Sequence, residues 1–579
     1  MDSTPNPIAL TLRCKAQGHL EYPSCIEIIS AAIDHPQYGN IGSLKAWRIY
    51  RSRCPGAFLR ILDQDNSEMH TFSITLFDKF GHARPELVNP GYRSGTGCWG
   101  RELDSGALVY ILGFNIRPAY RGQGIGTRAL SQFLASEHVK IDDIVICWPS
   151  PSRIHDRCLW SITRSRQIAF FRKNHFRRIG RTNFFGYSPK QDHPSRAIAM
   201  ENDIGALDHD FPASDLGAEE RKFRYPLLYA VAEDKSPSVA AVIQACYERD
   251  PESIRRPDEK GFTPIFGAAT CSNLHAVRKL LEWDMRAELQ STSNAEGVTP
   301  LERLADTMRS TREFSETYLG WDGYSDQELT IEYLLKKATP GQVVNATNIS
   351  EYIAGAKYGC TCNQCAGGWL SPRMRFRLHF DAVFWADSMP MNFERFPQGQ
   401  IMHPSDMMDG PSDFIPPALH PSFYLSFYKG LCGVMRAIAN HLESTTRVLS
   451  VEGVLAFVKP NEHSQYFFKR GGRIEHAFDS ITNNAEDQSE LGDDTFWEYF
   501  GEDEAWLSLP TCANDLEFEL VRKMIGLDAR QQWGPYRKTR AAAQEKMEVD
   551  TPSDEDEVGD EDESDDEDII VPPMHKIFG

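Results

Sequence analysis

The chain has 579 residues, of which 41% are hydrophobic, so it is too long for one core and predicts several folded units. Its formal net charge is −20, and the stretch from Glu548 to Asp568 alone holds fourteen acidic residues and no Lys or Arg. The rest of the chain carries about −6, which argues against nucleic-acid binding because phosphate contact needs clustered cations.

Thirteen scattered cysteines argue against a disulfide framework and favour a reducing compartment. The first residues lack a basic stretch followed by an apolar run, and no later segment has about 18 uninterrupted apolar residues. We therefore expect an intracellular protein of the cytoplasm or nucleus that does not span a membrane.

Composition shifts predict five segments along the chain. They are an α/β or α+β domain over 1–190, a Pro- and Ser-rich linker over 191–222, an α-helical array over 223–340, a mixed region over 341–540 and an acidic, disordered tail over 541–579.

In the first segment, strand-like runs precede a more specific arrangement. The runs AWRIYR, AFLRILDQ and HTFSITLFD predict an antiparallel meander. A strand over Leu108–Ile116 then enters a glycine-rich turn, followed by a helix from Ile125 to Ala135 and a second strand from Asp143 to Trp148. Gly122, Gly124 and Gly126 would let backbone N–H groups approach an anion at the positive end of that helix.

The motif RGQGIG and its lead-in NIRPAY resemble the acetyl-coenzyme A motif of the GNAT-superfamily N-acetyltransferases. Downstream, RQIAFFRKNHFRRIG is similar to the closing helix and strand of that family, and the resemblance covers about 165 residues. It implies that backbone groups of Phe114, Asn115 and Ile116 pair with the pantetheine arm. It further implies that the pyrophosphate is held by Arg121, Gly122, Gln123, Gly124, Ile125 and Gly126. The alternatives are a structural glycine turn and a dinucleotide-binding fold, which needs a parallel βαβ unit.

The motif does not by itself assign the catalytic residues. When the Phe at the end of the family's second motif is aligned with Phe176, Phe171 falls where many relatives have a Tyr that acts as general acid. His175 falls where they have Gly. Glu102, with Asp104 nearby, is the candidate general base, and the alternative is a pair of solvated loop carboxylates. A basic stretch offers either phosphate ligands or a solvated helix face: Arg164, Arg166, Arg172, Lys173, Arg177, Arg178 and Arg181.

The segments starting Gly261-Phe-Thr-Pro and Gly297-Val-Thr-Pro lie 36 residues apart, close to the ankyrin period of about 33 residues. Together with a weaker copy from Tyr225, they resemble three degenerate ankyrin repeats. The third copy carries an insertion, TREFSETYLGWDGYSDQ. Such an array implies a surface for a protein partner, or merely helices packed on their neighbours.

Cys360, Cys362 and Cys365 form Cys-x-Cys-x-x-Cys, which provides three corners of a zinc tetrahedron. The fourth ligand is open between Cys432, Cys512 and His403, and the alternative is a loop of reduced thiols. This segment also resembles one that follows ankyrin repeats in fungal proteins.

These patterns predict an enzyme that transfers acetyl from acetyl-coenzyme A to an amine. The acceptor stays open among protein N-termini, lysines, polyamines and small amines. The alternative is an ankyrin-repeat adaptor whose first domain is catalytically weak or inactive. The acidic tail predicts either a contact with basic proteins or a solubilising role.

Overall fold

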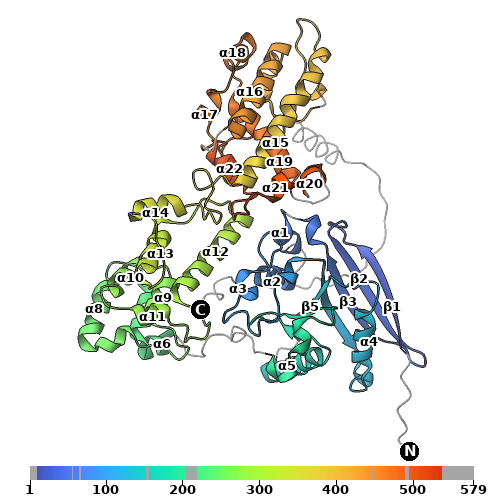
Figure 1. Cartoon of the computed structure of the whole chain (residues 1–579), viewed down its shortest axis with the longest axis vertical. Helices are drawn as coiled ribbons and strands as arrows, with labels where there is room; N and C mark the ends of the chain where they lie inside the picture. The colour runs from blue at the N-terminus through green and yellow to red at the C-terminus, as the bar shows by residue number, and fades with distance from the viewer. Residues whose placement is uncertain are drawn as a thin grey trace, which may run out of the picture.

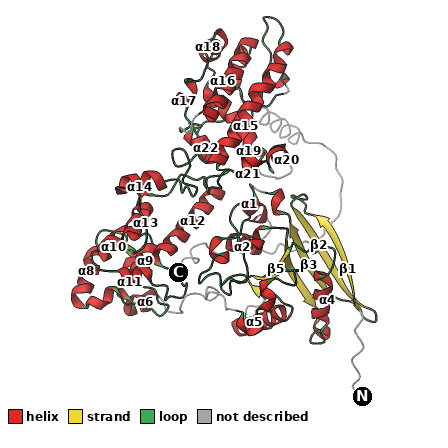
Figure 2. Cartoon of the chain, viewed as in Figure 1, coloured by secondary structure: helices red, strands yellow, loops and turns green. Residues whose placement is uncertain are grey.

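The computed structural model describes residues 10–54, 56–63, 67–151, 156–203, 218–407, 409–444, 448–489, 495–501 and 503–536. The acidic stretch from Glu548 to Asp568 lies outside these residues. Within them, no helix is both long and apolar enough to cross a membrane. The chain is a mixed α/β protein: an N-terminal sheet with helices is followed by a largely helical region (Figure 2).

The N-terminal part is built on one seven-stranded sheet of order β1-β2-β3-β4-β5-β7-β6. Figure 1 shows β1, β2 and β3 side by side in this sheet. Its strands are β1 (Thr11–Gly18), β2 (Ile26–His35), β3 (Gly39–Ile49), β4 (Leu108–Ile116), β5 (Ile144–Cys147), β6 (Arg177–Arg178) and β7 (Phe185–Tyr187). β1 to β4 are antiparallel, and among the described strands only the β4–β5 pair is parallel. Both strands flanking the glycine turn are therefore confirmed. An antiparallel meander precedes the turn, but of the three runs predicted to form it only AWRIYR lies in a strand, β3.

Helices cover both faces of this sheet. The N-terminal helices are α1 (Phe58–Asp63), α2 (Ser67–Leu76), α3 (Pro85–Val88), α4 (Ile125–Leu134) and α5 (Arg157–Lys173). One core cluster joins α1 and α2 to residues such as Tyr110 and Ile146, and another joins α4 and α5 to Val109 and Val145. Because side chains alternate along a strand, α2 and α4 pack on opposite faces.

Two segments predicted as strands are helices: AFLRILDQ forms α1 and HTFSITLFD forms α2. The prediction was wrong because Phe, Ile and Thr favour strands in isolation. The buried positions of α2 are Met69, Phe72, Ser73 and Leu76, which is the spacing of one helix face. Packing on the sheet decides the structure of this segment.

Residues 191–203, which the sequence analysis placed in a linker, pack against the first sheet. His193 and Ser195 are buried, and the Asp203 carboxylate binds the Arg172 guanidinium at 2.6 Å. The described chain resumes at α6 (Ala218–Arg224).

The next region is a stack of helix pairs. Its helices are α7 (Pro226–Glu233), α8 (Val239–Arg249), α9 (Pro264–Thr270), α10 (Leu274–Leu280), α11 (Arg286–Gln290), α12 (Pro300–Tyr318), α13 (Asp326–Ala338) and α14 (Ile349–Ala356). α7, α9 and α12 contact one another in succession, as do α8, α10 and α13. The pairs share one core, in which Ala268, Val277 and Leu304 are fully buried.

The insertion predicted in the third repeat lengthens a helix. α9 has seven residues, whereas α12 starts at the matching Thr-Pro and has nineteen. The added turns carry Glu313 and Glu316, which meet Arg84 at 2.8 Å and Lys79 at 3.3 Å. Earlier on α12, Arg309 meets Glu86 at 2.8 Å. The longer helix therefore holds the array against the N-terminal domain.

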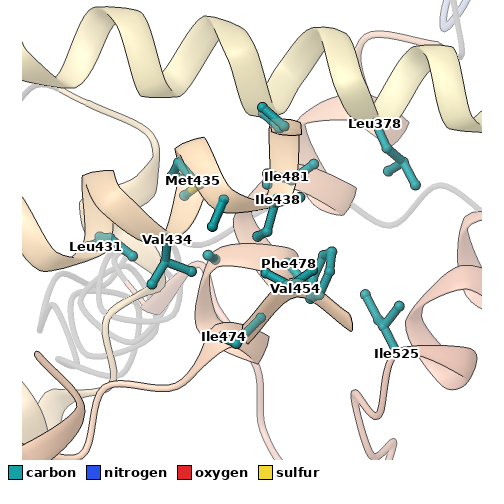
Figure 3. Close-up of a cluster of buried hydrophobic side chains, with 14 of the residues drawn as sticks. Leu378, Leu431, Val434, Met435, Ile438, Val454, Ile474, Phe478, Ile481 and Ile525 are labelled. Carbon is teal, nitrogen blue, oxygen red and sulfur yellow. The ribbon is translucent and has the colours of Figure 1, made fainter. Parts of the chain in front are cut away.

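The C-terminal region has its own core, formed by α15 and the helices after it. These are α15 (Pro372–Ser388), α16 (Leu425–Ser444), α17 (Val451–Leu455), α18 (Glu462–Lys469), α19 (Ile474–Asp487), α20 (Thr495–Phe500), α21 (Glu504–Leu507) and α22 (Phe518–Met524). Leu378, Ile438 and Ile481 come from three of these helices, and they meet Ile525, which follows α22, in one cluster (Figure 3). We predicted a mixed region, but within the described part of 341–540 the only β pairing is an isolated bridge between Ala366 and Leu370.

Candidate functional site

β4 and β5 are paired only at their first four residues. The parallel pairing runs from Leu108 with Ile144 to Ile111 with Cys147, whereas β4 continues to Ile116. A register shift between β3 and β4 lies at the same level, opposite Lys45 and Ala46. The second half of β4 therefore has β3 on one side and no named strand on the other.

The amides of this half-strand alternate in direction. The Arg117 N–H donates to the Ile41 carbonyl of the β3 side at 2.9 Å, so by alternation the N–H groups of Phe114 and Ile116 point the other way. Asn115 pairs opposite Ser43 and its N–H faces β3. Of the three residues predicted to contact an extended ligand, Phe114 and Ile116 thus direct their amides to the open side, and Asn115 does not.

The glycine turn leads directly into α4. Gly122 and Gly124 have φ of +77° and +75°, and a Cβ on either would meet no atom within 4 Å. Gly124 is the N-cap residue of α4, and no side chain caps this end. The first amides of the helix therefore lack both intrahelical partners and a side-chain cap, an arrangement that suits an anion.

Gly126 has a different role from the one predicted. It lies inside α4, and a Cβ there would be 3.3 Å from the Phe170 ring and 3.7 Å from the Phe114 ring. Those two rings stack with centroids 5.6 Å apart. Gly126 lets α4 approach α5 and β4 closely, so it clears space for side chains instead of a ligand.

The Arg121 side chain is fixed by its neighbours in the turn. Its Nε donates to the Ile116 carbonyl at 2.6 Å, and a terminal nitrogen donates to Asn115 Oδ1 at 2.9 Å. Gln123 Nε2 donates to the Ala119 carbonyl at 3.3 Å. These bonds hold the end of β4 and the turn in one conformation while the turn stays exposed.

The closing helix α5 ends in a left-handed residue. His175 has φ of +66°, a conformation that favours Gly, and the resemblance described above aligns this position with a Gly. Phe171, at the usual Tyr position, is only 8% exposed and packs edge-on against Phe170 and Phe176. The ring at position 171 is part of the core.

Most of the basic stretch binds the protein itself. Arg177 and Arg178 are buried and donate to backbone carbonyls, including those of Ile198 and Thr182. Arg164 donates to Asn183 at 2.7 Å. Neither the phosphate-binding nor the solvated-face interpretation fits these arginines, and only Arg166 and Lys173 are exposed.

Glu102, the predicted base, is held in a hydrogen-bonded chain. Its Oε1 accepts from the Gly100 N–H at 2.6 Å and lies 3.1 Å from His193 Nε2, and the other ring nitrogen of His193 lies 2.8 Å from the buried Ser195 hydroxyl. Burial raises the pKa of Glu102, but the bonds from His193 and Gly100 outweigh it and the pKa is lowered. Asp104 accepts from the Ala83 N–H at 2.6 Å. Both carboxylates have structural partners.

Glu68 on α2 is a carboxylate that the sequence analysis missed. Tyr110 donates its hydroxyl to Glu68 Oε1 at 2.7 Å, and Tyr110 lies one residue before β4 and β5 separate. Burial raises the pKa of Glu68, and the Tyr110 bond offsets part of that rise. A half-buried carboxylate with a raised pKa beside an opening is typical of a general base. Glu68 lies just before the run HTFSITLFD that was predicted to be a strand, and only the folding of this stretch as α2 places Glu68 beside Tyr110.

The three motif cysteines meet a fourth from a distant segment. The sulfurs of Cys360, Cys362, Cys365 and Cys512 all lie within 4.8 Å of one another. Successive separations are 3.7, 3.7 and 3.5 Å. Four sulfurs bound tetrahedrally at about 2.3 Å from zinc are roughly 3.8 Å apart, so the cluster could hold a zinc ion.

Hydrogen bonding within the cluster favours the thiolate form of Cys512, whereas the same bond raises the pKa of the Cys365 thiol that donates it. The hydrogen bond from Cys365, with backbone N–H groups of Asn514, Cys362 and Thr361, lowers the pKa of Cys512. The Asn514 side chain donates to Cys365 at 3.6 Å. The other two predicted fourth ligands are engaged elsewhere. Cys432 donates to the Ala386 carbonyl, and His403 bonds to Ser405.

No protein-family model matches the chain, and comparisons with curated proteins and with solved structures find no match either.

Proposed function

We propose that the N-terminal domain binds acetyl-coenzyme A and transfers its acetyl group to an amine. The observation that carries this proposal is the opening between β4 and β5 beside the uncapped start of α4. An extended pantetheine arm can pair with the free amides of Phe114 and Ile116. A pyrophosphate can bind the amides that follow Gly124. One cosubstrate would occupy both features at once.

The reaction joins the acceptor nitrogen to the acetyl carbonyl carbon and breaks the carbon–sulfur bond of the thioester. The nitrogen loses a proton to Glu68, and coenzyme A leaves as a thiolate. Phe171 has no proton to give, so the thiolate takes its proton from water. Holding the amine and the thioester together contributes several kcal/mol to such a step, by order of magnitude.

Titrating the full chain with acetyl-coenzyme A tests the proposal, because binding should be saturable at one site per chain. Release of the free thiol in the presence of amines then separates an enzyme from a binder. Absence of binding would reject the proposed function outright. Binding without thiol release from any amine would leave the adaptor interpretation.

The Glu68→Gln variant should lower kcat by about 100-fold, because glutamine keeps the shape and the Tyr110 bond but cannot take a proton. The KM for acetyl-coenzyme A should not change, since α2 and α4 lie on opposite faces of the sheet. In the parent protein, activity should fall as the pH drops through the raised pKa of Glu68. This decrease, the acid limb of the pH–rate profile, should be absent in the variant.

The matched control is Glu102→Gln, which alters a carboxylate already bound to His193 and Gly100. It should retain nearly the full rate and the acid limb. If Glu102→Gln removes the limb while Glu68→Gln keeps it, the base is Glu102 as the sequence suggested.

We also propose that the four cysteines bind one structural zinc ion. The thiolates supply all four ligands, so no position is open for a reacting water. The ion would tie the segment 360–365 to Cys512, whose neighbours Ala513 and Asn514 accept hydrogen bonds from Arg312 of α12 at 2.6 and 2.9 Å. Zinc would thereby stabilise the junction between the helix array and the C-terminal region.

The stacked helix pairs support the resemblance to ankyrin repeats. We propose that this array serves first as an internal scaffold, because α12 is the helix that meets the N-terminal domain.

A further inference from the structure

A cavity of about 430 Å³ lies where the N-terminal domain meets the helix array. Thr71 and Thr75 of α2, Trp148 after β5 and Arg181 in the β6–β7 turn line one side of it. Asp306 and Arg309 of α12 line the other. We call it the junction cavity. Its volume falls within the range of small-molecule sites, which commonly form between domains.

The junction cavity adjoins the place where β4 and β5 separate. Trp148 directly follows Cys147, which belongs to the last β4–β5 pair. Phe184 of the cavity wall lies 5.4 Å from the Trp148 ring and 6.5 Å from the Tyr110 ring. On α2, Glu68 precedes Thr71 by three residues and therefore shares its helix face. A ligand in this cavity would approach the proposed reaction centre from the Glu68 side.

Positive charge is in excess around the cavity. Its lining includes five arginines and two carboxylates, and four of the arginines meet carboxylates. The pairs are Arg84 with Glu313, Arg93 with Asp306, Arg303 with Glu296, and Arg309 with both Glu86 and Asp306. The cations of these pairs are neutralised within the protein.

Arg181 differs from the other four. Its Nε donates to the Tyr92 carbonyl at 3.0 Å, and its guanidinium lies 3.9 Å from the Tyr92 ring centroid. Among the described residues, its two terminal nitrogens have no protein acceptor and no carboxylate partner. The stacked ring holds the planar group in place, so it is ready to bind a carboxylate or phosphate through two parallel hydrogen bonds.

We propose that the junction cavity is the acceptor site and that it selects a small amine bearing a carboxylate or phosphate group, which Arg181 binds. This inference rests on the proposed acetyl transfer and adds the substrate class. The amine nitrogen then attacks the thioester while the anionic group stays on Arg181. The array takes part because α12 closes the far side of the cavity.

Thiol release from acetyl-coenzyme A by the full chain tests the selection with matched amines. L-alanine is compared with L-alaninamide, and glucosamine 6-phosphate with glucosamine, so each pair differs in the anionic group. At least one anionic member should exceed its partner by about tenfold or more in kcat/KM. Which pair responds distinguishes carboxylate from phosphate.

The Arg181→Gln variant should lose about 10- to 100-fold in kcat/KM for the anionic amine, mainly through KM, and should not change acetyl-coenzyme A affinity. Arg181→Lys should restore part of the loss. The control is Arg286→Gln, an exposed arginine outside the cavity that pairs with Asp284. Thermal unfolding of each variant verifies that it is folded.

The possible failures are distinct. If acetyl-coenzyme A does not bind, the proposed function fails and this inference fails with it. If it binds but neutral amines or peptide N-termini are preferred, or if Arg181→Gln reacts like the parent protein, only the anionic-acceptor proposal is overturned.

Discussion

The Gly124→Val variant is expected to bind acetyl-coenzyme A about 100-fold or more weakly than the parent protein. Gly124 has φ of +75° at the start of α4, and its Cβ position faces open space. Valine would put two methyl groups over the amides that we propose bind the pyrophosphate, and it would disfavour the left-handed backbone that aims them. Calorimetric titration of the full chain measures the change.

A control has to separate the backbone strain that valine introduces at position 124 from steric blockage of the phosphate site. Gly341 provides the control, because it has φ of +82° in an exposed turn after α13 and likewise has no atom within 4 Å of its Cβ position. Gly341→Val should carry a similar strain of about 1–2 kcal/mol but bind the coenzyme normally. Equal affinities for the parent and Gly124→Val would mean that the turn does not hold the phosphates.

The Cys512→Ser variant is expected to lose the bound zinc and to unfold at a lower temperature than the parent protein. A decrease of about 3 kcal/mol in the free energy of unfolding lowers the Tm of a folded unit of about 150–250 residues by roughly 6–12 °C. The cause is that Cys512 joins a site whose other ligands lie 147 or more residues earlier. Metal analysis of the purified chain should give one zinc ion per parent chain, and thermal unfolding gives the Tm.

The matched control is Cys432→Ser, a half-buried thiol of the same region, whose hydrogen bond goes to the Ala386 carbonyl outside the cluster. It should keep its zinc and nearly the parent Tm. The parent protein is expressed with added zinc. If it then contains no metal and is no more stable than Cys512→Ser, the metal site is contradicted.

The N-terminal domain and the segment that follows Cys512 both meet α12. The N-terminal domain contacts this helix through Arg84 and Lys79, and Arg312 of the helix donates to the carbonyl of Ala513, the residue after Cys512. Glu316 binds both Lys79 and Arg312. Loss of zinc would then disturb the helix that lines the junction cavity.

The sequence by itself determined the features whose residues are contiguous. The strand over Leu108–Ile116, the glycine turn and the helix from Ile125 have local causes: a continuous apolar run, positive φ at Gly122 and Gly124, and a 3.6-residue period. The same is true of the Thr-Pro starts of α9 and α12, where a capping Thr precedes Pro at the first helical position.

Only the tertiary structure decided the features that join distant segments. α1 and α2 are helices because one face of each is buried against the sheet, which outweighs the strand preference of their side chains. The fourth cysteine and the junction cavity unite residues more than a hundred positions apart. Which distant residues meet depends on how whole elements pack, and hydrophobic packing is not directional, so no local pattern encodes it.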